Sequence, residues 1–314
     1  AVMLEYRQLA KKIAQKAGLQ GDTPLDVLAH LKAKKITDPK AVEALYYDSA
    51  KRLDRIIKEN NLVSLPAAPL KIRLAGEAES KAHPVPHLSI PPLVNNKGER
   101  PEFVVPIASD GKLPFDDFSY EAAAMSLTAH EGRPGHDLQF SSMLDNGVSI
   151  IRARYAFNSV NAEGWGLYAE DLVYPYLNDE AKFASLQMRL WRIARMFLDP
   201  QLQLGEIKPA DVINTFTKEV GISKRLAELE VERYTFDMPA QAPSYYYGLK
   251  KLLKAKSELR EKIATPISER CFHDAVLAQG LLPLDLIVER LSGSLNCPAS
   301  DTAADTPGRQ NNVM

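Results

Sequence analysis

The chain has 314 residues, 45% hydrophobic and 25% charged, a globular composition with room for one large core or two smaller ones. Its 39 basic and 40 acidic residues leave a net charge of −1, so no overall field favours nucleic acid. No apolar run approaches the roughly 18 residues that cross a bilayer. We expect a soluble protein with no nucleic-acid partner and no membrane span. The two cysteines lack C-x-x-C spacing and point to no particular redox environment, so the compartment stays open. The oligomeric state stays open as well.

Residues 1–64 are typical of an N-terminal helical segment. Three helices are expected there, the last of them ending at Asn60. Thr23 and Asp38 have the side-chain oxygens of N-caps, and each precedes a proline, whose missing N–H costs nothing at the first helical position.

The region from about residue 65 to 110 has a different texture. Prolines divide short alternating runs such as LKIRLAG and EFVVPIA, which indicates edge strands and ordered loops and so a small β-sheet. Helices are expected at residues 120–133, 137–145, 152–174, 180–198, 209–219, 222–236, 244–264, 267–279 and 284–292. The predicted fold class is therefore mainly α. We expect one domain over 65–292 and a disordered polar tail over 293–314.

The stretch HEGRPGHDLQF at 130–140 begins like the zinc-protease motif H-E-x-x-H, but Pro134 replaces the second histidine and the next histidine is His136. On a straight helix, side chains six residues apart point about 120° away from each other. Pro134 must kink or end the helix, and Gly135 permits backbone angles closed to other residues. Such a break would bring both imidazoles to one point. The alternative is a capped helix end with His130 bonded to a backbone carbonyl.

The stretch NAEGWGLYAED holds Glu163 among two glycines, each costing about 1 kcal/mol in a helix interior, a cost that close approach of another element would justify. Neutral imidazoles of His130 and His136 with the Glu163 carboxylate make the three-ligand set of a catalytic zinc site. Glu131 is then placed to take a proton from water at the fourth position. The alternative is a solvent-facing acidic side of the helix formed by Glu163 and Glu170, against which the apolar neighbours argue.

A third stretch, VERYTFDMPAQAPSYYYGLKK, supplies a phenol and a guanidinium. Tyr245 can donate to a developing oxyanion, and Arg233 can pair with a substrate carboxylate. For the tyrosines, the alternative is aromatic packing. For Arg233, the alternative is a surface ion pair with Glu228, Glu230 or Glu232, and the residues alone slightly favour this ion pair. If Arg233 faces the metal, short substrates with a free C-terminus or an acidic group should be preferred.

Four ordered blocks resemble the largely bacterial "domain of unknown function 885" family, whose members are similar to zincin-type metallopeptidases. The matching residues are His130, Glu131, Pro134, Gly135, His136 and Gln139; then Glu163, Gly164, Trp165, Tyr168 and Glu170; then Arg233, Tyr234, Pro239, Gln241, Ala242, Tyr245 and Gly248; and finally Phe272 to Leu284. The resemblance runs from about Leu65 to Leu291. Because family members are longer at the N-terminus, the chain resembles their C-terminal, site-bearing portion.

The resemblance implies a zincin-like helical fold and a Zn²⁺ site with roles for nine residues. The metal ligands would be His130, His136 and Glu163, the catalytic residues Glu131, Tyr245 and Arg233, and the substrate-binding residues Gln241, Tyr234 and Gln203. The chain departs from the family pattern in three places. Asp137 stands where a second histidine is usual, Ala240 where glycine is usual, and Gln203 replaces a histidine in a segment that keeps Asp199.

The leading hypothesis is a zinc-dependent hydrolase that cleaves peptide or other amide bonds through metal-activated water, with a peptide or small amide as its partner. One alternative is a catalytically altered family member that acts as a binding or scaffold protein, motivated by Gln203, Ala240 and the shorter N-terminus. The other is a non-haem iron redox enzyme, because two histidines and a carboxylate also suit iron. Such iron sites usually lie on β-barrels, and this chain is helical.

Overall fold

The computed structural model describes residues 1–107, 115–262, 267–293 and 295. Its first three helices are α1 (Val2–Ala17), α2 (Pro24–Lys32) and α3 (Pro39–Glu59). Both predicted N-caps are confirmed. The Thr23 hydroxyl accepts from the Asp26 N–H at 3.3 Å, and the Asp38 carboxylate accepts from the Ala41 N–H at 2.8 Å.

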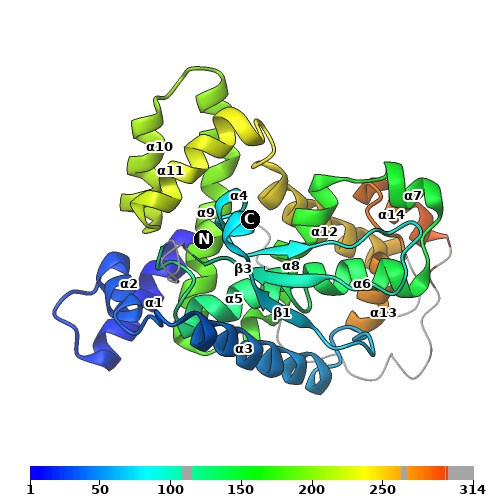
Figure 1. Ribbon diagram of the computed structural model, residues 1–314, viewed down its shortest axis with the longest axis horizontal. Helices are drawn as coiled ribbons and strands as arrows, with labels where there is room; N and C mark the ends of the chain where they lie inside the picture. The colour runs from blue at the N-terminus through cyan, green and yellow to red at the C-terminus, as the bar shows by residue number, and fades with distance from the viewer. Residues whose placement is uncertain (108–114, 263–266, 294, 296–314) are drawn as a thin grey trace.

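A three-stranded sheet lies in front of the central helices (Figure 1). It consists of β1 (Lys71–Leu74), β2 (His87–Ser89) and β3 (Glu102–Val105), with α4 (Glu77–Ala82) between the first two strands. The strand order is β1-β3-β2, with β1 parallel and β2 antiparallel to β3. Three consecutive residues of the middle strand, 103–105, are buried, as expected of a strand covered on both faces. The predicted small sheet is confirmed.

The remaining helices make the protein mainly α, as predicted. They are α5 (Glu121–Glu131), α6 (His136–Asn146), α7 (Ile150–Tyr155), α8 (Ser159–Val173), η1 (Tyr174–Tyr176), α9 (Asp179–Gln203), α10 (Pro209–Thr215), η2 (Phe216–Val220), α11 (Lys224–Glu232), η3 (Arg233–Asp237), α12 (Ser244–Lys262), α13 (Glu269–Leu277) and α14 (Leu284–Ser292). The single helix predicted over 152–174 is wrong. The chain leaves α7 and starts α8 anew, because the Asn158 side chain accepts from the Asn161 N–H at 2.9 Å and caps the second helix.

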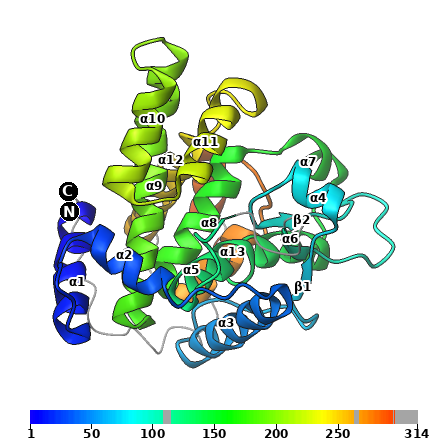
Figure 2. The same cartoon turned by 60° about the vertical axis from the view of Figure 1, so that its left-hand side comes forward.

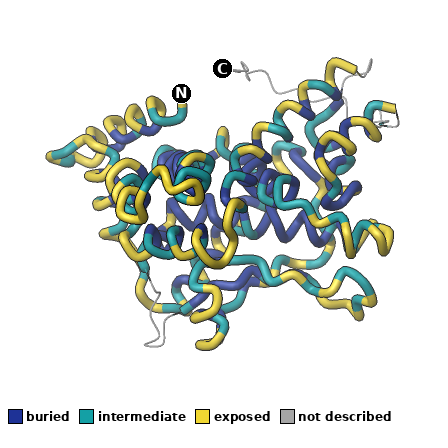
Figure 3. The backbone as a smooth tube through the Cα atoms, turned by 90° about the horizontal axis from the view of Figure 1, so that it is seen from above, coloured by how far each residue is buried: buried dark blue, intermediate teal, exposed yellow. Residues whose placement is uncertain are grey.

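Helices α5 and α8 lie in the middle of the molecule, between α9 on one side and the sheet on the other (Figure 2). Buried residues concentrate in these central helices and exposed ones at the periphery (Figure 3). Helix α8 packs directly on α12 through glycines. A Cβ atom at Gly164 would lie 2.6 Å from the backbone of Gly248, so only glycines allow this approach. The close packing on α12 explains Gly164, the first of the two glycines inside α8.

The N-terminal helices share a hydrophobic core with α5 and α9. The Tyr6 ring stacks on Phe183 with ring centroids 4.5 Å apart, and the Tyr46 hydroxyl donates to the Phe118 carbonyl at 2.8 Å. The division into domains at residue 64 stays a prediction, and most of the predicted tail, 296–314, lies outside the described residues. Within the described part of the chain, no helix has the length and apolarity needed to cross a membrane.

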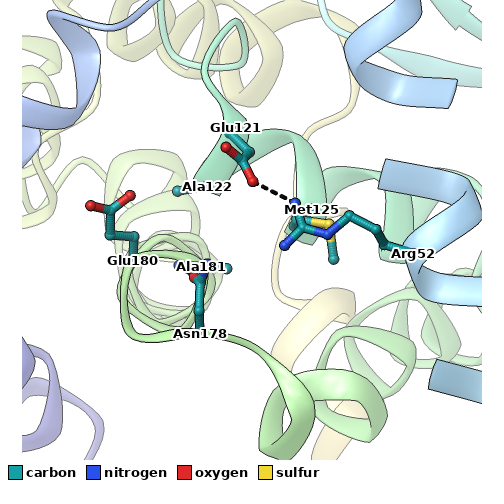
Figure 4. Close-up of a pocket in the computed structure, with 7 residues that line it drawn as sticks. All are labelled: Arg52, Glu121, Ala122, Met125, Asn178, Glu180 and Ala181. Carbon is teal, nitrogen blue, oxygen red and sulfur yellow. Dashed lines mark hydrogen bonds and ion pairs between the residues drawn. The ribbon is translucent and has the colours of Figure 1, made fainter. Parts of the chain in front are cut away.

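A small surface pocket lies between α3, α5 and the start of α9 (Figure 4). It is lined by Arg52, Glu121, Ala122, Met125, Asn178, Glu180 and Ala181. Its volume is about 10 Å³, room for roughly one water molecule. Arg52 and Glu121 form an ion pair across it. The pocket is therefore too small to hold a substrate.

The loop before α12 is fastened to α9 by one carboxylate. Asp199 is fully buried and accepts from the N–H groups of Ala240 at 3.2 Å and Ala242 at 3.3 Å. To reach this position, Ala240 takes a left-handed backbone with φ of 63°. That conformation is strained for alanine and open to glycine, the residue usual at this position in the family that the sequence resembles.

We expect Ala240→Gly to raise the free energy of unfolding by about 1 kcal/mol, because the strain at this positive φ is removed. Urea unfolding followed by circular dichroism measures the change. Ala242→Gly is the matched control: Ala242 is buried in the same loop without a positive φ, so its replacement should lower stability. A destabilised Ala240→Gly variant would contradict the strain at this position.

Candidate metal site

The two histidines come from helices separated by a sharp break. Helix α5 ends at Glu131 and α6 begins at His136, and the Arg133–Pro134 peptide between them is cis. A Cβ atom at Gly135 would lie 1.9 Å from the His130 carbonyl oxygen, so this turn requires glycine. The predicted proline-glycine break is confirmed, although α5 ends two residues before the predicted limit of 133.

The break brings His130 and His136 together with Glu163 of α8. Ligand atoms of the three side chains all lie within 4.8 Å of one another. Oxygen Oε2 of Glu163 is 3.6 Å from Nε2 of His130 and 3.5 Å from Nε2 of His136. Gly166, one turn along α8, makes room for the first ring, since a Cβ atom there would lie 2.5 Å from His130 Cε1. The three predicted metal ligands therefore form one cluster.

The second nitrogen of each histidine faces a hydrogen-bond acceptor. His130 Nδ1 lies 2.8 Å from Oε1 of Glu170, whose Oε2 accepts from the Ser126 hydroxyl at 3.0 Å. His136 Nδ1 lies 3.4 Å from the Gln139 side-chain oxygen. A neutral imidazole that donates from Nδ1 presents the lone pair of Nε2 to the cluster, which is the arrangement of metal-binding histidines.

Glu170 is a supporting residue whose role the sequence did not predict. Its side chain is 3% exposed, so the alternative of a solvent-facing acidic side formed with Glu163 is wrong. A signal was available: Glu170 lies two turns after Glu163 on one helix face, and a metal-binding histidine needs an acceptor for its second nitrogen. Arg192 of α9 lies 3.4 Å from the Glu170 carboxylate and balances its charge.

Electrostatics couples the three side chains. Burial lowers the pKa of His130, but hydrogen bonds to Glu163 and Glu170 outweigh this effect and raise the pKa to about 9. Burial raises the pKa of Glu163, yet its hydrogen bonds to the two histidines hold that pKa well below its usual range. Two nitrogen donors and one carboxylate that attract positive charge are a donor set that fits Zn²⁺.

Glu131, the predicted proton acceptor, sits at the last residue of α5. The residue is partly exposed, and among the residues that the structure describes none forms a hydrogen bond or ion pair with its carboxylate. Its charge is one contribution to the raised pKa of His130, the residue that precedes it.

Three further predicted residues meet beside the cluster. The Tyr245 ring lies parallel to the His130 ring with centroids 6.2 Å apart. Arg233 donates to the Tyr245 hydroxyl at 3.1 Å and to the Gln241 side-chain oxygen at 2.6 Å. Gln241 in turn donates to Oε1 of Glu163 at 3.4 Å. The structure thus connects Arg233 to the candidate ligands, and its alternative as a surface arginine paired with neighbouring glutamates is wrong.

A buried ion pair packs against Tyr245, one of these three residues. Arg195 of α9 binds Glu230 through two hydrogen bonds of 2.7 and 2.6 Å, and its guanidinium carbon lies 4.6 Å from the centre of the Tyr245 ring. The sequence predicted a role for neither Arg195 nor Glu230, because nothing local to either residue indicates a contact between α9 and α11.

The structure does not bring Tyr234 and Gln203 to the three candidate ligands. Tyr234 is fully buried and donates to Glu230 at 2.6 Å, and Gln203 donates to the Tyr234 carbonyl. Their contact with a substrate stays a prediction. Asp137 is buried too, and it accepts from Arg133 at 2.7 Å.

A family comparison shows the relationship of the chain. The family described as "bacterial protein of unknown function (DUF885)" matches residues 2–291. The chain belongs to this family. The match includes the N-terminal helices, so it reaches further than the resemblance expected from about residue 65. No curated protein matches the chain.

Two solved structures share the fold. A protein of unknown function from Shewanella oneidensis, described as a candidate lipoprotein, superposes with a TM-score of 0.77 at 19% identity, over 92% of this chain and 54% of that one. A candidate lipoprotein from Colwellia psychrerythraea gives 0.77 at 20% identity, over 93% and 50%. This DUF885 chain therefore spans about half the length of these proteins.

Glu230 should make stability depend on pH. Burial raises the pKa of its carboxyl, but the charge of Arg195 and the hydrogen bonds outweigh this and lower it from 4.5 to about 2. A depressed pKa stabilises the fold above the unfolded-state value, by about 3 kcal/mol, and the effect is lost as pH falls from about 4.5 toward about 2.

We expect Glu230→Gln to be less stable than the wild type at pH 7 and the difference to shrink across this acid range. Thermal unfolding between pH 7 and pH 2 measures it. Glu232→Gln, whose side chain is 51% exposed, controls for the loss of one carboxylate on the same helix. A difference that stays constant with pH would contradict the lowered pKa of Glu230.

Gly166→Ala should weaken metal binding roughly 10-fold or more, because the new methyl group would displace the His130 ring. Zinc titration against a competing chelator measures the affinity. Alanine is the better helix former by about 1 kcal/mol, so an affinity loss with intact helix content identifies a steric cause. Gly76→Ala is the control, since a Cβ atom at Gly76 meets no atom within 4 Å. Unchanged affinity in Gly166→Ala would show that His130 does not bind the metal in this position.

Proposed function

We propose that the chain carries the active site of a zinc-dependent hydrolase of peptide or other amide bonds. The observation that carries the proposal is the cluster of His130, His136 and Glu163, in which both Nε2 atoms face one carboxylate and both Nδ1 atoms have acceptors. Structural zinc sites are closed by four protein ligands, whereas catalytic sites use three and keep one position for water. The cluster offers three donor side chains from three helices, which supports a catalytic zinc site over a structural one.

Zinc, when bound, would act as a Lewis acid on the amide carbonyl and make its water acidic. The Glu131 carboxylate would accept the proton of the attacking water and pass it to the leaving nitrogen. These roles need Glu131 to be accessible, and it is partly exposed at the end of α5.

Tyr245 is suited to stabilise the oxyanion that develops on the carbonyl. Its hydroxyl oxygen accepts from Arg233 at 3.1 Å, which leaves the phenolic hydrogen for donation. Burial raises the pKa of Tyr245 despite the nearby arginines, so the phenol keeps this hydrogen at neutral pH. A preorganised donor of this kind is worth most where water is excluded.

The departures from the family pattern leave this arrangement in place, which supports a hydrolase over a scaffold protein. Ala240 keeps the left-handed backbone that glycine would adopt, and its N–H still binds Asp199. Gln203 contacts the Tyr234 carbonyl and none of the three candidate ligands.

The decisive test is the metal content of protein purified without chelators. We expect about one zinc per chain, lost in His130→Ala and kept in His83→Ala, which changes an exposed histidine. Glu131→Gln should keep zinc but cleave a library of short peptides at least about 100-fold more slowly, because general-base catalysis is lost.

Three outcomes would count against the proposal. Protein that neither contains zinc nor binds added zinc would exclude it. Iron with oxygen-dependent turnover would favour a redox enzyme. A zinc-loaded wild type that cleaves no faster than Glu131→Gln would favour a binding protein.

A further inference from the structure

We propose that Arg233 forms a carboxylate-binding site beside the metal cluster, so that the substrate carries a free carboxylate close to the amide bond that is cleaved. The substrate class would be short peptides with a free C-terminus, or small N-acylated amino acids. The cleavage part of this inference rests on the proposed hydrolase, whereas binding of the carboxylate does not require catalysis.

Arg233, which is partly buried, differs from the buried arginines in its partners. Those are each paired with a carboxylate: Arg133 with Asp137 at 2.7 Å, Arg192 with Glu170 at 3.4 Å and Arg195 with Glu230 at 2.6 Å. The hydrogen-bond partners of Arg233 are neutral, the Gln241 amide and the Tyr245 phenol. Throughout the described ranges, no carboxylate lies within ion-pair distance of its guanidinium, and its Nε is buried without a hydrogen-bond partner.

The carboxylate of Glu230, which lies near Arg233, is already paired with Arg195. Glu230 is close enough to raise the pKa of Arg233. Its two oxygens, however, accept from the Arg195 guanidinium, the Tyr234 hydroxyl and the Trp191 indole N–H. Of these two guanidinium groups, that of Arg195 lies within ion-pair distance of Glu230 and that of Arg233 does not. A partly buried charge without a partner is costly, and a ligand carboxylate would remove that cost.

The place of Arg233 sets the size of the substrate. One side chain, Gln241, bridges Arg233 to the Glu163 carboxylate, and another, Tyr245, lies between Arg233 and the His130 ring. A carboxylate held by the guanidinium is therefore about one residue away from a carbonyl at the metal cluster. The interior of a long chain has no main-chain carboxylate to offer, so a free C-terminus is preferred.

The alternative role of Arg233 is to position Tyr245 only. In that case removing the guanidinium would slow cleavage of every substrate and would not depend on a carboxylate. Binding measured without turnover separates the two roles, because the position of Tyr245 does not distinguish an acid from its amide.

The experiment measures equilibrium binding to Glu131→Gln protein, which should hydrolyse neither probe. Isothermal titration compares N-acetyl-dialanine with its C-terminal amide. We expect the acid to bind at least about 10-fold more tightly, and this preference to weaken with added salt. Arg233→Met in the same background should abolish the preference, and Arg233→Lys should keep only part of it, because lysine cannot form the two-pronged contact.

Arg225→Met is the matched control. Arg225 lies on α11, is 53% exposed and pairs with Glu228 and Glu232, so its loss removes the same charge from the same region without affecting the preference. N-acetyl-alanyl-glutamate α-amide, whose only carboxylate is on the side chain, tests whether an acidic side chain can replace the C-terminus.

Equal binding of acid and amide to the Glu131→Gln protein would overturn the inference. So would a preference that persists in Arg233→Met with its fold intact by circular dichroism, and if that variant does not fold, a full preference in Arg233→Lys would do the same. Failure of the hydrolase proposal looks different: the acid would still bind preferentially, but zinc or cleavage would be missing from the wild type.

Discussion

The turn at residues 132–135 is the constraint on which the site depends. A continuous helix would point His130 and His136 in different directions, and the turn brings them together. It is held from outside the segment, because the Trp165 indole N–H donates to the Pro134 carbonyl at 2.9 Å. Trp165 belongs to α8, the helix that supplies Glu163. The same helix therefore provides the third donor and stabilises the turn that positions the first two.

Burial of charge explains why the surroundings of the cluster are ordered. His130 is hydrogen-bonded to Glu170, which is paired with Arg192. The Tyr245 ring packs against the guanidinium of Arg195, which is paired with Glu230. Removing one partner of a buried pair typically costs about 3–5 kcal/mol, so each link requires the next. Both chains of contacts include an arginine of α9, Arg192 in the first and Arg195 in the second. This helix thus stabilises the metal side and the guanidinium side of the site together, although it supplies no candidate ligand.

The sequence predicts those features that depend on local chemistry. The caps at Thr23 and Asp38 and the break at Pro134 follow from neighbouring residue types, and the three candidate ligands were selected by residue type and spacing. Contacts between distant helices were not predictable in this way. Glu230 shows the difference, since its closeness to Arg233 in sequence favoured an ion pair between them, but the fold turns its carboxylate toward Arg195 of α9. The new start of α8 at Ser159, after the Asn158 cap, was also missed, because apolar residues continue across the interruption.

Two of the three departures from the family pattern, Ala240 and Gln203, fall on one side of the site, whereas Asp137 lies on α6 and pairs with Arg133. Ala240 lies in the loop that Asp199 holds, and Gln203 binds the carbonyl of Tyr234, the residue next to Arg233. The Tyr234 hydroxyl also helps to occupy Glu230 and so to leave Arg233 without a counter-charge. The three candidate metal ligands all match the family pattern. Variation at Ala240 and Gln203 therefore acts on the layer around Arg233 and Tyr245 and leaves the three candidate ligands untouched.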